Sequence, residues 1–242
     1  MFIQPRLLRL AALPFALMAI LLVTVQTAPV SAEGQVDTGF ALPFTDPPGP
    51  TTWLLAQVYG NSVGAFARRR EWYAAGQGIH FGVDFSVRCQ TPVRAIGDGT
   101  VLKVDAPEHG AAPHNLLIMH DTPAGRFVSL YGHLFQRSQL HAGDKVTRGQ
   151  VVALSGDPDL TCTSRPHLHL EIRDATLGRA LNVHRLINAD WDALMLSGSF
   201  GRGFQRDLDA PRKWQTVMDQ PDIHFGGPFI NEFAHTWPQD WR

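Results

Sequence analysis

Three short stretches of the sequence carry histidines at spacings that suit metal or catalytic chemistry. The first is GIHFGVDF, in which His80 precedes Asp84 by four residues. The second is SLYGHL, with His133, and the third is PHLHLEIR, with His167 and His169 two residues apart. Imidazole and carboxylate groups are ordinary zinc ligands. Taken singly, the first pair could also be a hydrogen-bonded pair at a sheet edge, and a lone strand histidine such as His133 is more often structural.

All three stretches alternate in the way that β-strands do. Side chains on a strand point to opposite faces in turn, so His80 and Asp84 would share one face. In the third stretch Glu171 joins the two histidines on a polar face, and leucines occupy the opposite face. A row of polar groups facing a core is costly unless it is satisfied. This face is therefore either exposed to solvent or part of a site.

The region that must position these strands, residues 79–173, is predicted to be antiparallel sheet. Its β-branched runs are short and are separated by turn signals. Asp98-Gly99 predicts a hairpin between strands over 93–96 and 100–104, and residues 116–134 predict a second hairpin. Regular turns without a long amphipathic period favour an antiparallel sandwich or barrel.

The amino terminus has the pattern of a secretory signal. Arg6 and Arg9 are followed by a run from Leu10 to Val25 that contains no charge, and then by the small residues of Val30-Ser31-Ala32. The run is shorter than the roughly 20 residues that span a bilayer. We therefore expect cleavage after Ala32, no stable membrane insertion afterwards, and export to an extracellular or cell-envelope location, the periplasm or the cell wall. An uncleaved membrane anchor is the alternative.

Composition excludes several other classes of protein. The 21 Lys and Arg residues nearly balance 22 Asp and Glu residues, so charge gives no case for a nucleic-acid partner. A hydrophobic content of 44% is too high for a disordered chain. Two cysteines cannot staple a small disulfide scaffold, and they do not form a zinc-finger pair.

Taken in order, the three stretches resemble one known family. HFGVD over 80–84, YGHL over 131–134 and HLHLE over 167–171 are similar to the motifs of the lysostaphin-like (LytM-type) zinc endopeptidases of bacterial cell walls. The resemblance covers residues 75–175. It implies an all-β fold, a compact antiparallel β-sandwich with a metal groove on one sheet.

The same resemblance assigns roles to five residues. It implies that His80, Asp84 and His169 bind one zinc ion per chain. It implies that His133 and His167 are catalytic, and either could orient or deprotonate the attacking water, since the helical HExxH base is absent.

Two neighbouring residues keep more than one interpretation. Glu171 would either support a ligand or lie at the surface. Tyr131, which alternation places on the face of His133, would either donate to the oxyanion or pack beside that histidine.

Two features depart from the family pattern. The stretch before the last histidines, residues 156–166, is usually glycine-rich but here is longer and stiffer, and we expect it to border the groove. Cys89 lies five residues after Asp84, and Cys162 lies five before His167. Because both motifs converge on the metal, we expect a Cys89–Cys162 disulfide, with thiol ligation of the metal as the alternative.

The chain is expected to have four segments. They are a signal peptide over 1–32, a lead-in packing on the catalytic domain over 33–74, the LytM-type peptidase domain over 75–185, and an extension of unknown role over 186–242. The extension is expected to be irregular and partly helical, with a helix over 181–196.

The resemblance implies a secreted zinc metalloendopeptidase that hydrolyses peptide bonds in peptidoglycan stem peptides or cross-links. The sequence itself leaves the oligomeric state open, and we expect a monomer. One alternative is a non-catalytic cell-wall-binding regulator of another hydrolase, although such relatives typically lack ligands and this chain lacks none. Another is a cupin-like metal binder, which would use HxHxE and leave Asp84 unused.

Overall fold

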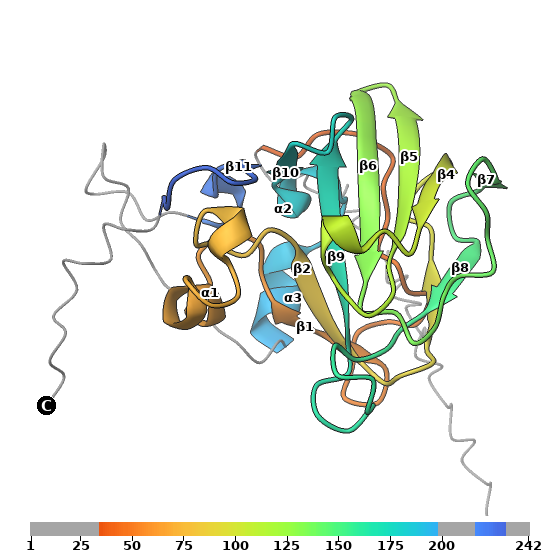
Figure 1. Cartoon of the computed structure of the whole chain (residues 1–242), viewed down its shortest axis with the longest axis horizontal. Helices are drawn as coiled ribbons and strands as arrows, with labels where there is room; N and C mark the ends of the chain where they lie inside the picture. Colours follow the sequence, from red (N-terminus) through yellow and green to blue (C-terminus); the bar gives the residue numbers. More distant parts are fainter. Residues whose placement is uncertain (1–33, 198–215, 231–242) are drawn as a thin grey trace, which may run out of the picture. The chain divides into compact units, whose positions relative to one another are not determined.

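The computed structural model describes residues 34–197 and 216–230, and antiparallel sheet dominates these ranges (Figure 1). All of them belong to one unit, Ser31–Arg242. The predicted signal peptide over 1–32 and parts of the 186–242 extension lie outside the described residues. No helix in the described ranges has the length and apolar character that crossing a bilayer requires.

The main sheet runs in the order β1-β2-β9-β6-β5-β4-β7, with β10 and β11 continuing beside β9. Its strands are β1 (Trp53–Gln57), β2 (Val83–Val87), β4 (Gly99–Val104), β5 (Leu116–Thr122), β6 (Gly125–Gly132), β7 (Lys145–Val146), β9 (His167–Asp174), β10 (Arg179–Leu181) and β11 (Ile223–His224). A second sheet pairs β3 (Pro92–Arg94) with β8 (Val151–Leu154). The predicted antiparallel β fold is confirmed.

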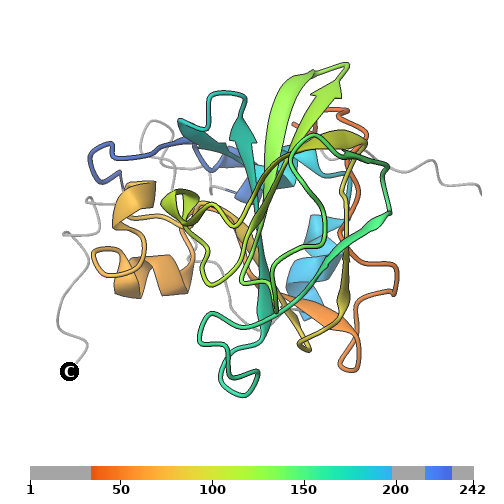
Figure 2. The same ribbon diagram turned by 45° about the vertical axis from the view of Figure 1, so that its right-hand side comes forward.

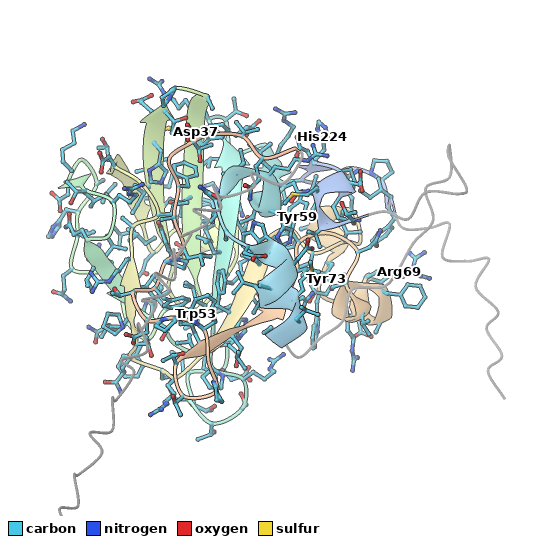
Figure 3. The ribbon with its side chains drawn as sticks, turned by 180° about the vertical axis from the view of Figure 1, so that it is seen from behind. Asp37, Trp53, Tyr59, Arg69, Tyr73 and His224 are labelled. Atoms are coloured by element: carbon cyan, nitrogen blue, oxygen red, sulfur yellow. A yellow bond between two sulfur atoms is a disulfide. The ribbon has the colours of Figure 1, made fainter. Side chains whose placement is uncertain are left out.

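Short helices flank the sheet. They are α1 (Val63–Arg68), α2 (Val183–Leu186) and α3 (Trp191–Ser197), with 3-10 turns η1 (Ala74–Gly76), η2 (Pro107–His109) and η3 (Val217–Asp219). Seen from behind, α3 lies over β1 (Figure 3). Figure 2 shows α1 and α3 on opposite sides of β9.

Alternation along β2 and β9 separates a core face from a polar face. Phe85, Leu168 and Leu170 are completely buried and belong to the main hydrophobic cluster, which also includes Trp191 of α3. Asp84, the neighbour of Phe85 on β2, points to the opposite face and is only partly buried. The helices α2 and α3 therefore cover one face of the sheet and leave the other for the groove.

The segment predicted as a lead-in contributes one strand to the sheet and several aromatic side chains to the core. β1 pairs with β2 at the edge of the sheet. Phe40 forms a bridge with Ile187, and Phe44 stacks on Trp53 with ring centroids 5.2 Å apart.

The hairpin predicted at Asp98-Gly99 is wrong. β3 pairs with β8, and β4 pairs with β5 and β7. A two-residue type I′ turn needs positive φ at both central residues, and neither Asp98 nor Gly99 has it. Gly99 serves close packing instead, because a Cβ there would lie 2.6 Å from Met119 O. The second predicted hairpin is present as β5 and β6.

The helix predicted over 181–196 is divided. Leu181 ends β10, and residues 187–190 separate α2 from α3. The break occurs where Ile187 pairs with Phe40 and so leaves helical geometry.

The two cysteines form a disulfide. Cys89 and Cys162 are joined with a Cα–Cα distance of 5.8 Å across a sequence separation of 73. The bond ties the end of β2 to the loop between β8 and β9. Both thiols are thereby used, so the alternative of metal ligation by cysteine is excluded.

Replacing both cysteines, Cys89→Ser with Cys162→Ser, should lower the free energy of unfolding by about 2–4 kcal/mol, because a long loop is no longer closed in the unfolded chain. Urea denaturation of wild type and double variant measures this difference. Reductant provides the control, since it should shift the wild-type midpoint toward that of the variant and leave the variant unchanged. Equal midpoints under oxidising conditions would contradict the prediction.

Candidate metal centre

The register between β2 and β9 brings two distant motifs together. The strands are antiparallel, with Asp84 opposite His169 and Ser86 opposite His167. These four side chains alternate with buried apolar residues, so they share the face away from the core.

His80 reaches this face by a different route from the one predicted. β2 begins at Val83, and His80 instead makes an isolated antiparallel bridge with Gly60. Gly82 lies between His80 and the start of β2. A Cβ at this position would lie 2.6 Å from His169 Cε1 and 2.7 Å from Leu170 O. Glycine is thus required for the chain to pass so close to β9.

The three residues expected to bind metal converge. Asp84 Oδ1 lies 2.7 Å from His169 Nδ1 and 3.4 Å from His80 Nε2. One ligand atom from each residue falls within 4.8 Å of the others. Two imidazole nitrogens and a carboxylate oxygen at this spacing fit a metal site.

Outer partners fix which nitrogen of each ligand histidine faces the centre. His80 Nδ1 donates to Val58 O at 2.8 Å, which leaves Nε2 as the ligand atom. His169 Nε2 donates to Glu171 Oε1 at 3.1 Å, which leaves Nδ1. Such partners orient metal-bound imidazoles and raise their basicity. His80 Nε2 and His169 Nδ1 therefore face one point beside the Asp84 carboxylate.

Glu171 supports the ligand and is not a surface residue. It is completely buried, and Arg173 Nε donates to its Oε2 at 2.7 Å. Burial opposes ionisation, but Arg173 and His169 outweigh it and lower the pKa of Glu171. Burial likewise opposes ionisation of Asp84, and His80 and His169 hold its pKa well below the ordinary value. Both groups are carboxylates at neutral pH.

The remaining two histidines lie beside this centre. The ring centroids of His133 and His167 are 4.7 Å apart, and those of His133 and His169 are 5.7 Å apart. His167 Nδ1 donates to Arg165 O at 2.7 Å, and its Nε2 lies 3.9 Å from Asp84 Oδ1. The structure thus brings all five predicted site residues together.

A backbone bond also orients His133. Its Nδ1 donates to Ala112 O, so a neutral ring keeps its lone pair on Nε2. Burial, followed by the nearby His169 and His167 rings, lowers the pKa of His133 to about 4. This imidazole is neutral at pH 7 and able to accept a proton.

Tyr131 does not belong to the site. It is completely buried on the core side, where its hydroxyl accepts from Ile96 N at 2.9 Å. Alternation predicted that it would share a face with His133. That prediction fails because β6 ends at Gly132 and His133 has a left-handed φ of 53°, which redirects its side chain.

The site lies in a groove of about 580 Å³. Besides the five site residues, its lining residues are Ala56, Gln57, Trp72, Tyr73, Phe81, Ser86, Ala111, Pro158, Arg165 and Pro166. The 156–166 loop borders the groove, as expected. The wall formed by Trp72 and Tyr73 was not predicted. This segment has no strand alternation, and its only signal in the sequence is a pair of adjacent aromatic residues.

Comparison with known proteins identifies the domain that holds the site. Residues 78–183 match peptidase family M23. This matched stretch, termed the M23 domain, contains all five site residues. The match, with lysostaphin among the similar proteins, confirms the resemblance predicted from the three histidine stretches.

Several proteins are similar to the M23 domain. An uncharacterized metalloprotease of Haemophilus influenzae is 42% identical over 104 residues, which are 43% of this chain and 20% of that protein. Peptidoglycan DD-endopeptidase ShyA of Vibrio cholerae is 35% identical over 43% of this chain and 22% of its own length. Glycyl-glycine endopeptidase ALE-1 of Staphylococcus capitis is 34% identical over 39% of this chain and 24% of its own length. The chain therefore spans about a fifth of the length of these curated relatives.

Among solved structures, the catalytic domain of lysostaphin from Staphylococcus simulans is similar to the M23 domain. The identity is 29% and the TM-score is 0.34, over 39% of this chain and 67% of that one.

Replacing Glu171 by Gln should weaken zinc binding about 10- to 100-fold, because a neutral amide supports His169 less well than a carboxylate. Competition with a chelating dye measures the affinity. Glu108→Gln is the matched control, since Glu108 also pairs with a cation, Lys103 at 2.8 Å, but is exposed. Circular dichroism checks that the variant is folded. Wild-type affinity in folded Glu171→Gln would contradict the assigned support role.

Proposed function

We propose that this chain is a zinc metalloendopeptidase that hydrolyses peptide bonds in peptidoglycan stem peptides or cross-links. The observation that carries the proposal is the convergence of His80, Asp84 and His169 beside a second pair, His133 and His167, in one open groove. The three ligand atoms leave a fourth position open, as in catalytic zinc sites and unlike closed structural ones.

His80, Asp84 and His169 would hold the zinc ion. Zinc bound there would lower the pKa of a water molecule to about 7 and polarise the carbonyl of the cleaved bond. The carboxylate of Asp84 suits this role, and the outer hydrogen bonds of His80 Nδ1 and His169 Nε2 turn the opposite ring nitrogens toward that carboxylate.

His133 and His167 supply the proton transfers. Neutral His133 accepts a proton from the attacking water through Nε2, since its Nδ1 is held by Ala112 O. His167, oriented through its own Nδ1 by Arg165 O, presents Nε2 to the same space, and in its imidazolium form, with a proton on both nitrogens, it donates from Nε2 to the developing oxyanion or to the leaving amine. The 4.7 Å between the two rings lets one substrate bond face both.

Peptidoglycan is the substrate class that the relatives' names favour. ShyA is named a peptidoglycan DD-endopeptidase and ALE-1 a glycyl-glycine endopeptidase, and both are similar to part of this chain. An exported location is supported by the signal-like amino terminus and by the disulfide.

Purified zinc-loaded protein should release peptides from isolated sacculi, and a chelator should abolish this activity until zinc is restored. His133→Ala should lower kcat about 10²- to 10⁴-fold while keeping one zinc per chain, because it removes a proton-transfer group and no ligand. His169→Ala, in contrast, should lose the metal. Mass spectrometry of released peptides and zinc analysis of the same samples give both readouts.

Sacculi that remain intact with stoichiometric zinc would overturn the proposal. Cleavage that appears only when another hydrolase is added would point instead to a non-catalytic regulator.

A further inference from the structure

Trp72 lies in the groove wall close to two guanidinium groups. Its side chain is large and apolar, yet the residue is 53% exposed. Arg165 Cζ lies 5.3 Å from the Trp72 ring centroid, and Arg68 Cζ lies 5.2 Å from it. Arg68 ends α1 and Arg165 belongs to the β8–β9 loop, so two separate elements meet at this indole.

The cluster occupies one side of the metal centre. In the sheet order β1-β2-β9-β6, Asp84 lies on β2 and His169 on β9, His80 lies just before β2, and His133 follows β6. On the β1 side the lining includes the small residues Ala56 and Ser86 beside Gln57, and Trp72 and Arg165 line the same groove. The two small residues leave room for a ligand beside the larger side chains.

Arg165 is held in place by its own backbone. Its N–H donates to Asp157 Oδ2 at 3.2 Å, and its carbonyl accepts from His167 Nδ1. Asp157 is itself buried beneath the loop, and Cys162 anchors the loop through the disulfide. The Arg165 side chain therefore projects from a fixed main chain two residues from His167.

The guanidinium groups here keep donors available. Arg165 gives one nitrogen, Nη2, to Asp159 at 3.3 Å, and Arg68 gives Nη1 to Glu71 at 2.8 Å. These pairs are about half-exposed, and such pairs are weak. A guanidinium has five N–H donors, so most of those on Arg165 remain for a ligand.

Arg165 is the member of this cluster whose positive charge lines the groove itself. Its free N–H donors lie in one plane and match two acceptor oxygens carried by one anionic group. This donor arrangement favours an anionic ligand.

We propose that Arg165 and Trp72, with Arg68 behind them, form a subsite for a carboxylate group of the substrate peptide. The inference rests on the proposed function and names a substrate feature that it leaves open. Arginine binds a carboxylate through two parallel N–H···O bonds, and a carboxamide offers only one acceptor oxygen. The exposed face of Trp72 covers the aliphatic part of the same residue.

The test uses matched peptides and the full zinc-loaded chain. In a synthetic cell-wall peptide, each free carboxyl group is replaced in turn by a carboxamide. For wild type, one replacement should raise KM about tenfold, with kcat changing much less. In Arg165→Gln this discrimination should fall to less than twofold. Arg165→Lys, which keeps the charge but not the planar fork, should retain part of it.

Arg126→Gln is the matched control. Arg126 is also an exposed arginine paired with a carboxylate, Asp121 at 2.6 Å, and it lies on the β5–β6 hairpin outside the groove lining found in the described residues. It should keep the wild-type discrimination. Thermal unfolding checks that every variant is folded.

Discrimination that persists in folded Arg165→Gln, or that is absent from wild type, would overturn the subsite. If wild type cleaves no peptide, the proposed function fails, and calorimetric binding of the same peptides still decides the subsite. Equal binding of the carboxylate and carboxamide forms would then reject it, and tighter binding of one carboxylate form that is lost in Arg165→Gln would support it.

Discussion

The pairing of β2 with β9 is the constraint on which the rest of the site depends. It joins stretches 85 residues apart in the sequence and sets Asp84 beside His169. A slip of one residue would turn Phe85 and Leu168 out of the core and carry the ligands into it. The register that buries the apolar face is therefore the same register that brings Asp84 and His169 together. The same hydrophobic packing that stabilises the sheet also aligns the metal ligands.

Main-chain carbonyls then do most of the orienting. Val58, Ala112 and Arg165 each accept from the Nδ1 of one histidine, and each of these rings is left with Nε2 directed at the groove. His169 alone is oriented by a side chain, that of Glu171. Because carbonyls exist at every residue, this positioning depends on the path of the loops and not on the identity of their side chains.

The strands are aligned by their side-chain pattern, whereas the histidines are oriented by main-chain carbonyls. This difference explains how much could be predicted from the sequence. The alternation of polar and apolar residues around His167 and His169 is a local signal, so the strand, its polar face and the family resemblance were all accessible. Prediction failed where the backbone leaves regular geometry, as it does at His133, whose left-handed φ separates it from Tyr131. The 156–166 loop was expected at the groove, but its contact with Trp72 through Arg165 could not be predicted, because two non-periodic segments meet there only in the folded chain.

Arg165 takes part in the groove through two different sets of atoms. Its carbonyl orients the His167 ring, and its side chain lies near the Trp72 indole in the groove wall. A substitution at this position changes the second contact and preserves the first, since every amino acid supplies the same carbonyl. The side chains that line the groove can therefore change without altering the orientation of the imidazoles. Substitutions in this one loop can change which substrate is preferred while the catalytic histidines keep their positions.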